Sequence, residues 1–422
     1  MSPGNKSAAK HEEMKWSVCL QHLLPLTTAH HRMSVVYATQ KSAILDHESW
    51  LMELTKKYKI NNHEGEPTEH KRKNFQDLFD LRTPFLMDSQ AEKIAKQLEE
   101  SPALVMEPKR KKRKKDHMPQ RKEKEIELTH IREMFTVLRQ TPDFKLNYQF
   151  LPNIDDFRRN NSHIRNLRKS VSCCRFMEVT SSILPQLDEY HKGDEFGTKM
   201  INDNKYLVPP DVHYVCDDVN NILLHTLGFK FDVIVMDPPW QNKYVRRRTH
   251  AHGRHHGYGM MSVKDILQLP VGNLLEDGAL LVVWCTNSIS QIQEFLEGLN
   301  VWDVKLVATW FWLKVTKAGE PVTPLEGITH GKQPYERVFL AKKCSQGVVS
   351  QSIPDSLVFC SVPSGIHSHK PPLYELLKKY VGPHPQCLEL FARSLTPGWM
   401  CYGMEVLRLQ HSFLFEDSCQ DE

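Results

Sequence analysis

Four consecutive residues combine groups that a transfer reaction on an amine requires: the Asp237 carboxylate, the rigid backbone of Pro238 and Pro239, and the Trp240 ring. The exocyclic amine of a nucleobase is a poor nucleophile, because its lone pair is delocalised into the ring. The Asp237 carboxylate and a backbone carbonyl such as that of Pro238 can each accept one of its N–H groups, which aims the lone pair at an electrophilic carbon. Such catalysis rests on positioning and charge complementarity. Trp240 adds a stacking surface worth about 1–3 kcal/mol per base.

The segment before Asp237 predicts the element that positions it. Residues 233–236 are apolar on both faces, which is typical of a buried parallel strand. Asp237 then falls at the carboxyl end of the strand, where ligands bind in open α/β sheets. The two prolines cannot continue a strand ladder and favour an extended turn. We therefore expect the motif on a stiff loop at the edge of a sheet.

Strand-like and helix-like patterns alternate from residue 206 onward, which predicts an α/β fold with a mainly parallel sheet and helices on both faces. Ser262 is the expected N-cap of the first helix. Strands are predicted at 279–284, 304–312, 336–341, 357–362 and 388–391, and helices at 263–269, 290–299 and 371–381.

The remaining sequence is organised less clearly. We expect residues 1–121 to be partly disordered, with a helix-like pattern at 42–58. Residues 122–204 predict a small helical segment, with mixed helical signals up to residue 190 and a polar loop at 193–204. The main domain is predicted at 205–412, followed by a short tail at 413–422.

Composition excludes several classes of protein. The chain has 422 residues, of which 40% are hydrophobic, so part of it should bury a core. No apolar run is long enough for a membrane span, and the first residues lack the apolar stretch of a signal peptide. The ten cysteines form no CxxC pair, which favours a reducing compartment without disulfides or structural zinc.

Positive charge is concentrated in two segments. Residues 109–115 are seven consecutive lysines and arginines, a pattern typical of a nuclear address or a nucleic-acid patch, although a solvated charge run is the alternative. We expect a nuclear protein, with the cytosol as a second location. Arg246, Arg247 and Arg248 follow the Trp240 loop and are expected to track phosphates. Nearby histidines leave a metal site as an alternative there, but no carboxylate accompanies them, and we predict no metal.

Asp237–Trp240 resembles the signature of the eukaryotic N6-adenine methyltransferases of the MT-A type, which use S-adenosylmethionine. The resemblance covers about residues 205–409, and its details are most similar to the methyltransferase-like protein 4 branch. The segments that carry it are Asp218-Val219, Gly257-Tyr258-Gly259-Met260, Trp284-Cys285-Thr286-Asn287, Trp312-Leu313-Lys314, residues 330–336, His367-Ser368-His369-Lys370-Pro371-Pro372 and Glu389-Leu390-Phe391-Ala392-Arg393.

The resemblance implies a Rossmann-like methyltransferase fold whose catalytic half precedes its cofactor half. It places Asp218, Val219, Asp237, Lys370, Arg393 and Glu405 at the S-adenosylmethionine site. Lys370 and Arg393 also fit from the residues alone: Arg393 follows a buried strand, and Lys370 sits at a predicted helix start, where a cation opposes the helix dipole and better serves an anionic ligand. Met404 departs from the family pattern, because it stands where relatives carry an amide.

The resemblance also implies residues that contact the substrate: Tyr258, Trp312, Lys332 and Glu336. Loop packing is the alternative for Tyr258, and a salt bridge at a strand end is the alternative for Glu336. Trp310 is expected in the core, with Trp312 nearer the pocket.

The function expected from these features is S-adenosylmethionine-dependent N6-adenine methylation of nucleic acid. RNA, including 2′-O-methylated adenosine in small nuclear or capped RNA, is the first substrate class, and DNA adenine is the second. A nucleic-acid-binding scaffold that keeps the fold is the main alternative, and methylation of a protein amino group is a weaker one. No obligate protein partner and no membrane association are evident.

Overall fold

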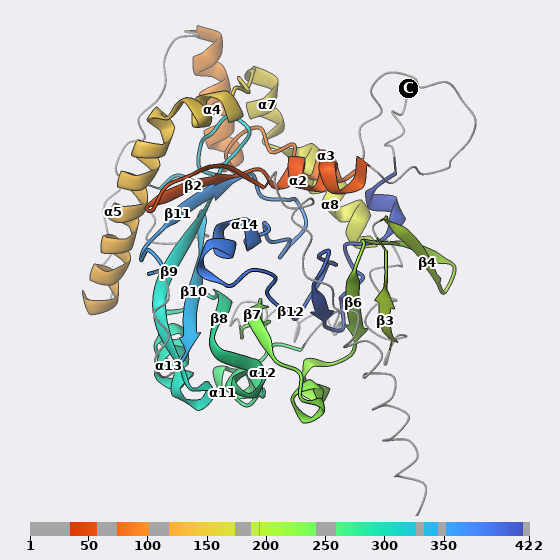
Figure 1. Ribbon diagram of the computed structural model, residues 1–422. Helices are drawn as coiled ribbons and strands as arrows, with labels where there is room; N and C mark the ends of the chain where they lie inside the picture. Colours follow the sequence, from red (N-terminus) through yellow and green to blue (C-terminus); the bar gives the residue numbers. More distant parts are fainter. Residues whose placement is uncertain are drawn as a thin grey trace, which may run out of the picture.

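The computed structural model describes residues 34–56, 74–100, 118–173, 187–193, 195–241, 259–325, 333–344 and 352–416. One eleven-stranded sheet curves through the centre of these residues, and helices lie around it (Figure 1). In spatial order its strands are β1 (Val35–Ala38), β2 (Ser42–Leu45), β11 (Val358–Ser361), β9 (Val304–Lys314), β10 (Tyr335–Lys343), β8 (Leu275–Cys285), β7 (Phe231–Met236), β12 (Cys387–Leu390), β13 (Met400–Tyr402), β6 (Val212–Cys216) and β3 (Leu187–His191).

Six of the ten neighbouring strand pairs are parallel, which confirms the predicted α/β fold with a mainly parallel sheet. The antiparallel pairs lie at the two ends of the sheet and on both sides of β10. Strands β12 and β13 come late in the chain but insert between β7 and β6. This crossover brings residues that lie far apart in the sequence to one edge of the sheet.

Side chains of the central strands alternate between two apolar cores, as the two-residue period of a strand requires. Leu281 and Val283 of β8 face a core that is covered by α11 (Val263–Leu267), α12 (Val271–Leu274), α13 (Ile289–Gly298), η2 (Leu224–Leu227) and η3 (Leu299–Trp302). Leu280 and Val282 face the opposite core, which is covered by α14 (Tyr374–Leu377) and η4 (Lys378–Tyr380).

Ser262 is the N-cap of α11, as predicted. Its hydroxyl accepts from the backbone N–H of Asp265, and the Asp265 carboxylate accepts in return from the backbone N–H of Ser262. The predicted strands at 279–284, 304–312, 336–341, 357–362 and 388–391 all correspond to strands of the structure.

The first half of the chain contributes mainly helices and one small additional sheet (Figure 1). Its helices are α2 (His47–Lys56), α3 (Asn74–Leu78), α4 (Asp88–Glu100), α5 (Met118–Gln140), α6 (Pro142–Asn147), α7 (Ile154–Arg159) and α8 (Ser162–Cys173); β4 (Gly197–Ile201) pairs with β5 (Asn204–Val208), and η1 (Val219–Asn221) and η5 (Ser412–Leu414) complete the described elements. None of the described helices has the length and apolar character that crossing a membrane would require.

Several boundaries predicted from the sequence are wrong. Residues 42–45, within the predicted helix at 42–58, form strand β2, and residues 187–190 form part of β3. Most of the polar stretch 193–204 belongs to a hairpin that turns at Asn202 and Asp203, both with positive φ. The last predicted helix begins at Tyr374 and not at Pro371.

The segments that flank the predicted domain pack against it. Strand β2 pairs with β11 inside the main sheet. Trp50 of α2 and Phe79, just after α3, share a core with Leu414 and Phe415, which lie in the predicted tail. The Asn74 amide donates to the Phe413 carbonyl at 2.7 Å. The described residues of the N-terminal region and of the predicted tail therefore belong to the folded core.

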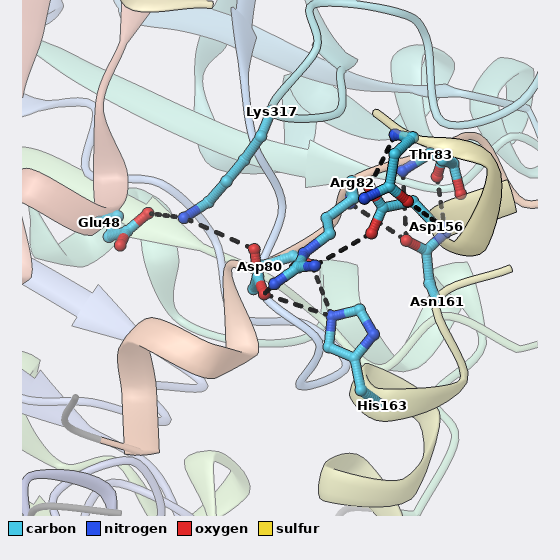
Figure 2. Close-up of polar contacts among 9 residues, drawn as sticks. Glu48, Asp80, Arg82, Thr83, Asp156, Asn161, His163 and Lys317 are labelled. Atoms are coloured by element: carbon cyan, nitrogen blue, oxygen red, sulfur yellow. Dashed lines mark hydrogen bonds and ion pairs between the residues drawn. The ribbon is translucent and has the colours of Figure 1, made fainter. Parts of the chain in front are cut away.

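A largely buried ionic cluster around Arg82 joins α2, α7 and α8 to the residues after α3 and after β9 (Figure 2). Arg82 pairs with Asp80 at 2.8 Å and with Asp156, in α7, at 3.0 Å, and both carboxylates are less than a tenth exposed. His163, in α8, also contacts Asp80. Lys317, in the connection after β9, contacts Glu48 of α2 at 3.1 Å. Although burial raises the pKa of Asp80, hydrogen bonds from His163 and Arg82 hold it well below its usual value.

We expect Arg82→Ala to lower the free energy of unfolding by about 3–5 kcal/mol, because it leaves two buried carboxylates without their cation. Chemical denaturation measures the change. The control is Arg139→Ala, since Arg139 forms a half-exposed pair with Glu320, and such pairs contribute about 0–1 kcal/mol. Equal losses in the two variants would contradict the structural role of the cluster.

Candidate active site

The candidate site lies at the carboxyl edge of five adjacent parallel strands, β8, β7, β12, β13 and β6. Asp237 directly follows β7, Arg393 follows β12 by three residues, and Asp218 follows β6 by two. Parallel strands place their carboxyl ends on the same side, so the sheet collects these side chains at one edge.

Asp237 is held between two cations. Arg393 donates to its Oδ2 at 2.8 Å, and the Lys370 Nζ lies 3.6 Å from its Oδ1. All three side chains are less than a fifth exposed. The structure therefore brings Asp237 together with two cations from much later in the chain, of which Arg393 is 156 positions away.

Both cations stand two residues after a strained backbone position. Ser368 and Phe391 each have φ of 60°, in the left-handed region that non-glycine residues rarely adopt. Such strain costs about 1–3 kcal/mol and concentrates at functional sites. The turn at Phe391 follows β12 at once and leads the chain to Arg393, whose guanidinium reaches Asp237.

Further charged side chains pair with Lys370 on one side of Asp237 and with Arg393 on the other. Lys370 and Lys314, at the end of β9, both bind the Glu336 carboxylate. On the other side, Arg393 donates to Glu405 at 3.1 Å. Burial alone would raise the pKa of Glu336, but the charges of Lys370 and Lys314 hold it well below its usual value. Burial likewise opposes the charge of Lys370, yet Asp237 and Glu336 raise its pKa. Glu336 and Lys370 are therefore both charged at neutral pH.

Trp240 and the two prolines form a closed turn. The Trp240 backbone N–H donates to the Pro238 carbonyl at 2.8 Å, and the Met261 N–H donates to the Pro239 carbonyl at 2.8 Å. The Trp240 indole Nε1 donates to the Trp284 carbonyl at 2.9 Å. These bonds fix the half-buried Trp240 ring, which packs edge-on against Phe295, and the turn is stiff, as the sequence predicted.

Several roles predicted from the sequence are wrong or narrower than predicted, and the first two concern Lys370 and Trp312. Lys370 does not start a helix, since α14 begins four residues later; it lies over the Trp284 ring at 5.0 Å instead. Trp312 is only 2% exposed and donates from Nε1 to the Ser361 hydroxyl, so it is a core residue like Trp310 and offers no free stacking face. Its ring supports the Lys314 ammonium at 4.6 Å.

Glu336 forms the salt bridges that were the alternative interpretation, and it does so inside the site. Val219 is fully buried in the apolar core, so its side chain is not available to a ligand. Asp218 accepts from the Asn220 backbone N–H at 3.0 Å and thereby caps the turn after β6.

Met404, which departs from the family pattern, is followed by Glu405, and two arginines hold the Glu405 carboxylate. The Glu405 side chain is 6% exposed and pairs with Arg393 and with Arg408, the latter at 2.7 Å. Glu405 therefore orients Arg393 toward Asp237. The Met404 carbonyl accepts from the Cys216 thiol at 3.4 Å.

Sequence reasoning did not assign Lys314, Arg408 or Glu389 to the site. Lys314 and Glu389 stood within segments of the family resemblance, and Glu389 is an acidic residue in an otherwise apolar strand. That pattern is the signal that could have identified it. Tyr258, Lys332, Arg246, Arg247, Arg248 and the basic run 109–115 lie outside the described residues.

The side chains gathered here fit S-adenosylmethionine. Asp237, Lys370, Glu389, Phe391 and Arg393 line one small cavity. A cofactor with a carboxylate, an ammonium and ribose hydroxyls needs nearby cations and carboxylates, and an adenine ring needs apolar surface; the cavity supplies each of these. Among the described residues, no group of three or more His, Cys, Asp and Glu side chains is arranged to hold a metal ion.

The fold and this site define a Rossmann-like methyltransferase domain. Residues 231–405 match the MT-A70 family model, so the chain carries an MT-A70 domain. MT-A70 methyltransferases use S-adenosylmethionine as the methyl donor, which agrees with the cofactor predicted from the sequence.

Curated proteins from three groups of organisms each align with about half of the chain. The chain is 39% identical over 221 residues to the N(6)-adenine-specific methyltransferase METTL4 of Mus musculus, which covers 50% of this chain and 45% of that protein. It is 37% identical to the DNA N6-methyl methyltransferase of Caenorhabditis elegans, with 50% and 56% covered, and 32% identical to the N6-methyladenosine RNA methyltransferase MTA1 of Pyricularia oryzae, with 49% and 55% covered. The matched region thus spans about half the length of these relatives.

We expect Lys370→Met to weaken binding of S-adenosylhomocysteine roughly ten- to a hundredfold, because a charge-assisted hydrogen bond contributes about 1.5–3 kcal/mol. Isothermal titration calorimetry measures the change. The fold should remain, since Lys314 still pairs with Glu336 and Arg393 with Asp237. The control is Lys378→Met, because Lys378 is half-exposed and lies in η4, next to α14. Equal affinities of both variants and the wild type would show that Lys370 does not bind the cofactor.

Proposed function

We propose that the chain is an S-adenosylmethionine-dependent N6-adenine methyltransferase that acts on nucleic acid. The observation that carries this proposal is Asp237, which stands at the carboxyl edge of the sheet between Arg393 and Lys370 and beside the fixed Trp240 ring. The names of the mouse, nematode and fungal relatives support the choice of the adenine N6 amine as acceptor.

In this proposal the loop holds the target amine by two acceptors. Asp237 accepts one N–H, and its orientation is fixed by Arg393, which Glu405 fixes in turn. The Pro238 carbonyl already accepts from Trp240, but a carbonyl oxygen has two lone pairs and can accept the second amine N–H. The methyl donor supplies an electrophilic carbon, and Lys370 and Arg393 are the cations available to its carboxylate and ribose.

RNA is the substrate class that we propose first, with 2′-O-methylated adenosine in small nuclear or capped RNA as the specific target and DNA adenine as the second class. The relatives include one named for RNA and one named for DNA, so both polymers belong in the test. We also propose a nuclear location, on the basis of the basic run 109–115.

The test is mass spectrometry of modified nucleosides after incubation of the full chain and methyl donor with matched RNA and DNA oligonucleotides. We expect N6-methyladenine with the wild type and a loss of about a hundredfold or more with Asp237→Asn, which keeps the shape of the side chain but removes its charge. Asp277→Asn, at an exposed position of β8, is the control and should keep wild-type activity.

Two results would contradict the proposal. Equal methylation by the wild type and Asp237→Asn would exclude Asp237 as the residue that holds the amine. Cofactor binding without methylation of either polymer would favour the scaffold alternative. The ratio of RNA to DNA product decides the substrate class.

A further inference from the structure

Glu389 is a carboxylate in the middle of the parallel sheet that the proposed reaction has not yet used. It lies on β12 opposite Val235 of β7 and Cys401 of β13. Strands of this kind, buried on both faces, normally carry apolar side chains, and an acidic residue there costs stability unless it is paired. No cation is hydrogen-bonded to Glu389 among the interactions that the described residues show; Thr396 supplies a hydroxyl.

Glu389 belongs to two cavities at once. It lines the small cavity that also contains Asp237, Lys370 and Arg393. It also lines a larger adjoining cavity that extends to α2 and α3, where His47 and Trp50 contribute to the wall. Glu389 therefore stands between the place where the amine is held and the interior of the protein.

The wall of the larger cavity is mostly apolar, but it contains polar atoms to which water can bind. It encloses about 90 Å³, and one water needs roughly 10–15 Å³ by the same measure. Four wall nitrogens have no hydrogen-bond partner among the described residues: His47 Nδ1, Trp50 Nε1, His369 Nδ1 and Trp399 Nε1. Buried polar atoms of this kind are normally satisfied by water. A chain of waters behind Glu389 would give a proton a way out of the site.

The charged and titratable groups that face Glu389 set its ionisation. Burial, together with the charge of Asp237, raises the pKa of Glu389 to about 7, although Arg393 and the Thr396 hydroxyl act in the opposite direction. On β13, burial raises the pKa of Cys401, which stays a neutral thiol. Along the cavity wall, burial lowers the pKa of His369 to about 4, so it is neutral, and Lys370 is charged. Glu389 is thus a carboxyl that can gain and lose a proton near neutral pH.

Methyl transfer to an amine must release a proton. As the N–CH₃ bond forms and the S–CH₃ bond of the donor breaks, both electrons of the broken bond stay on sulfur, and the nitrogen becomes cationic until one N–H bond breaks. Both oxygens of Asp237 already face a cation, which suits that residue to hold the amine. The proton therefore needs another acceptor.

We propose that Glu389 is this acceptor: its carboxylate takes the proton that the amine loses and releases it to water in the larger adjoining cavity. The proposal rests on the proposed function of the site. It assigns separate tasks to two carboxylates, since Asp237 orients the amine and Glu389 receives the proton. General-base catalysis of this kind contributes about 10²–10⁴-fold.

The test is Glu389→Gln, which preserves shape but cannot accept a proton, with Glu375→Gln on α14 as the control. We expect a single-turnover methylation rate at pH 7, measured at saturating methyl donor, about a hundredfold below the wild type. The wild-type rate should rise with pH through about 7, the value at which Glu389 loses its proton. The rate of the variant should lack this dependence, and Glu375→Gln should behave as the wild type does.

A second readout does not depend on activity. The folded-state pKa of Glu389 is raised above its unfolded value, so the wild type is stabilised at low pH and loses that stability as pH rises through about 7. The thermal midpoint of Glu389→Gln should therefore exceed that of the wild type at pH 8, and the difference should disappear near pH 4. A side chain with a purely structural role would give a variant of lower stability at every pH.

The outcomes separate the two proposals. Wild-type methylation with an unchanged rate and pH profile in Glu389→Gln would overturn the role of Glu389 and leave the proposed function intact. Loss of cofactor binding or of stability at all pH values in the variant would also overturn it, as a structural effect. Absence of methylation by the wild type itself would overturn both proposals.

Discussion

The balance of charge around Asp237 is the interaction on which the rest of this site depends. A carboxylate in a largely buried position is stable only if cations and hydrogen bonds replace the water that it loses. Arg393 and Lys370 provide that compensation, and each is itself anchored by a second carboxylate, Glu405 and Glu336. Asp237, Lys370, Arg393, Glu336 and Glu405 each have two partners of opposite charge, so the network holds the Asp237–Trp240 loop in one arrangement.

The order of the strands in the sheet places these opposite charges next to one another. Because β12 and β13 insert between β7 and β6, the turn after β12 is adjacent to the turn after β7, and Arg393 reaches Asp237 directly. The left-handed backbone at Ser368 and Phe391 directs the two cations inward. Residues of α2 and α3 contribute to the wall of the larger cavity that Glu389 also lines. The ionic cluster around Arg82 joins α2 and the residues after α3 to the connection after β9 (Figure 2).

Sequence patterns succeeded where a local cause determines the structure. The apolar runs of the central strands, the Ser262 cap and the stiff Asp237–Trp240 turn all follow from neighbouring residues, and all were predicted. The predictions from sequence patterns were wrong where contacts between residues far apart in the sequence decide the structure. Residues 42–45 have a helix-like pattern but pair with β11, and residues 197–208 form a hairpin that is stabilised in part by packing of Tyr206 against His411. Trp312 was placed in the pocket because it lies near a strand end, but the neighbouring β11 covers it.

The sequence by itself determined the class of chemistry, because an acidic residue, two prolines and a tryptophan after a buried strand constrain one another within four positions. It also named Lys370, Arg393 and Glu405 through their likeness to a family, and the positions of Lys370 and Arg393 in the predicted elements supported those two. Only the tertiary structure decided that these residues form one ionic network, that Lys314 extends it and that Glu389 stands between two cavities. The physical reason is that charge balance and burial are properties of neighbours in space, and these neighbours come from strands that the chain order separates.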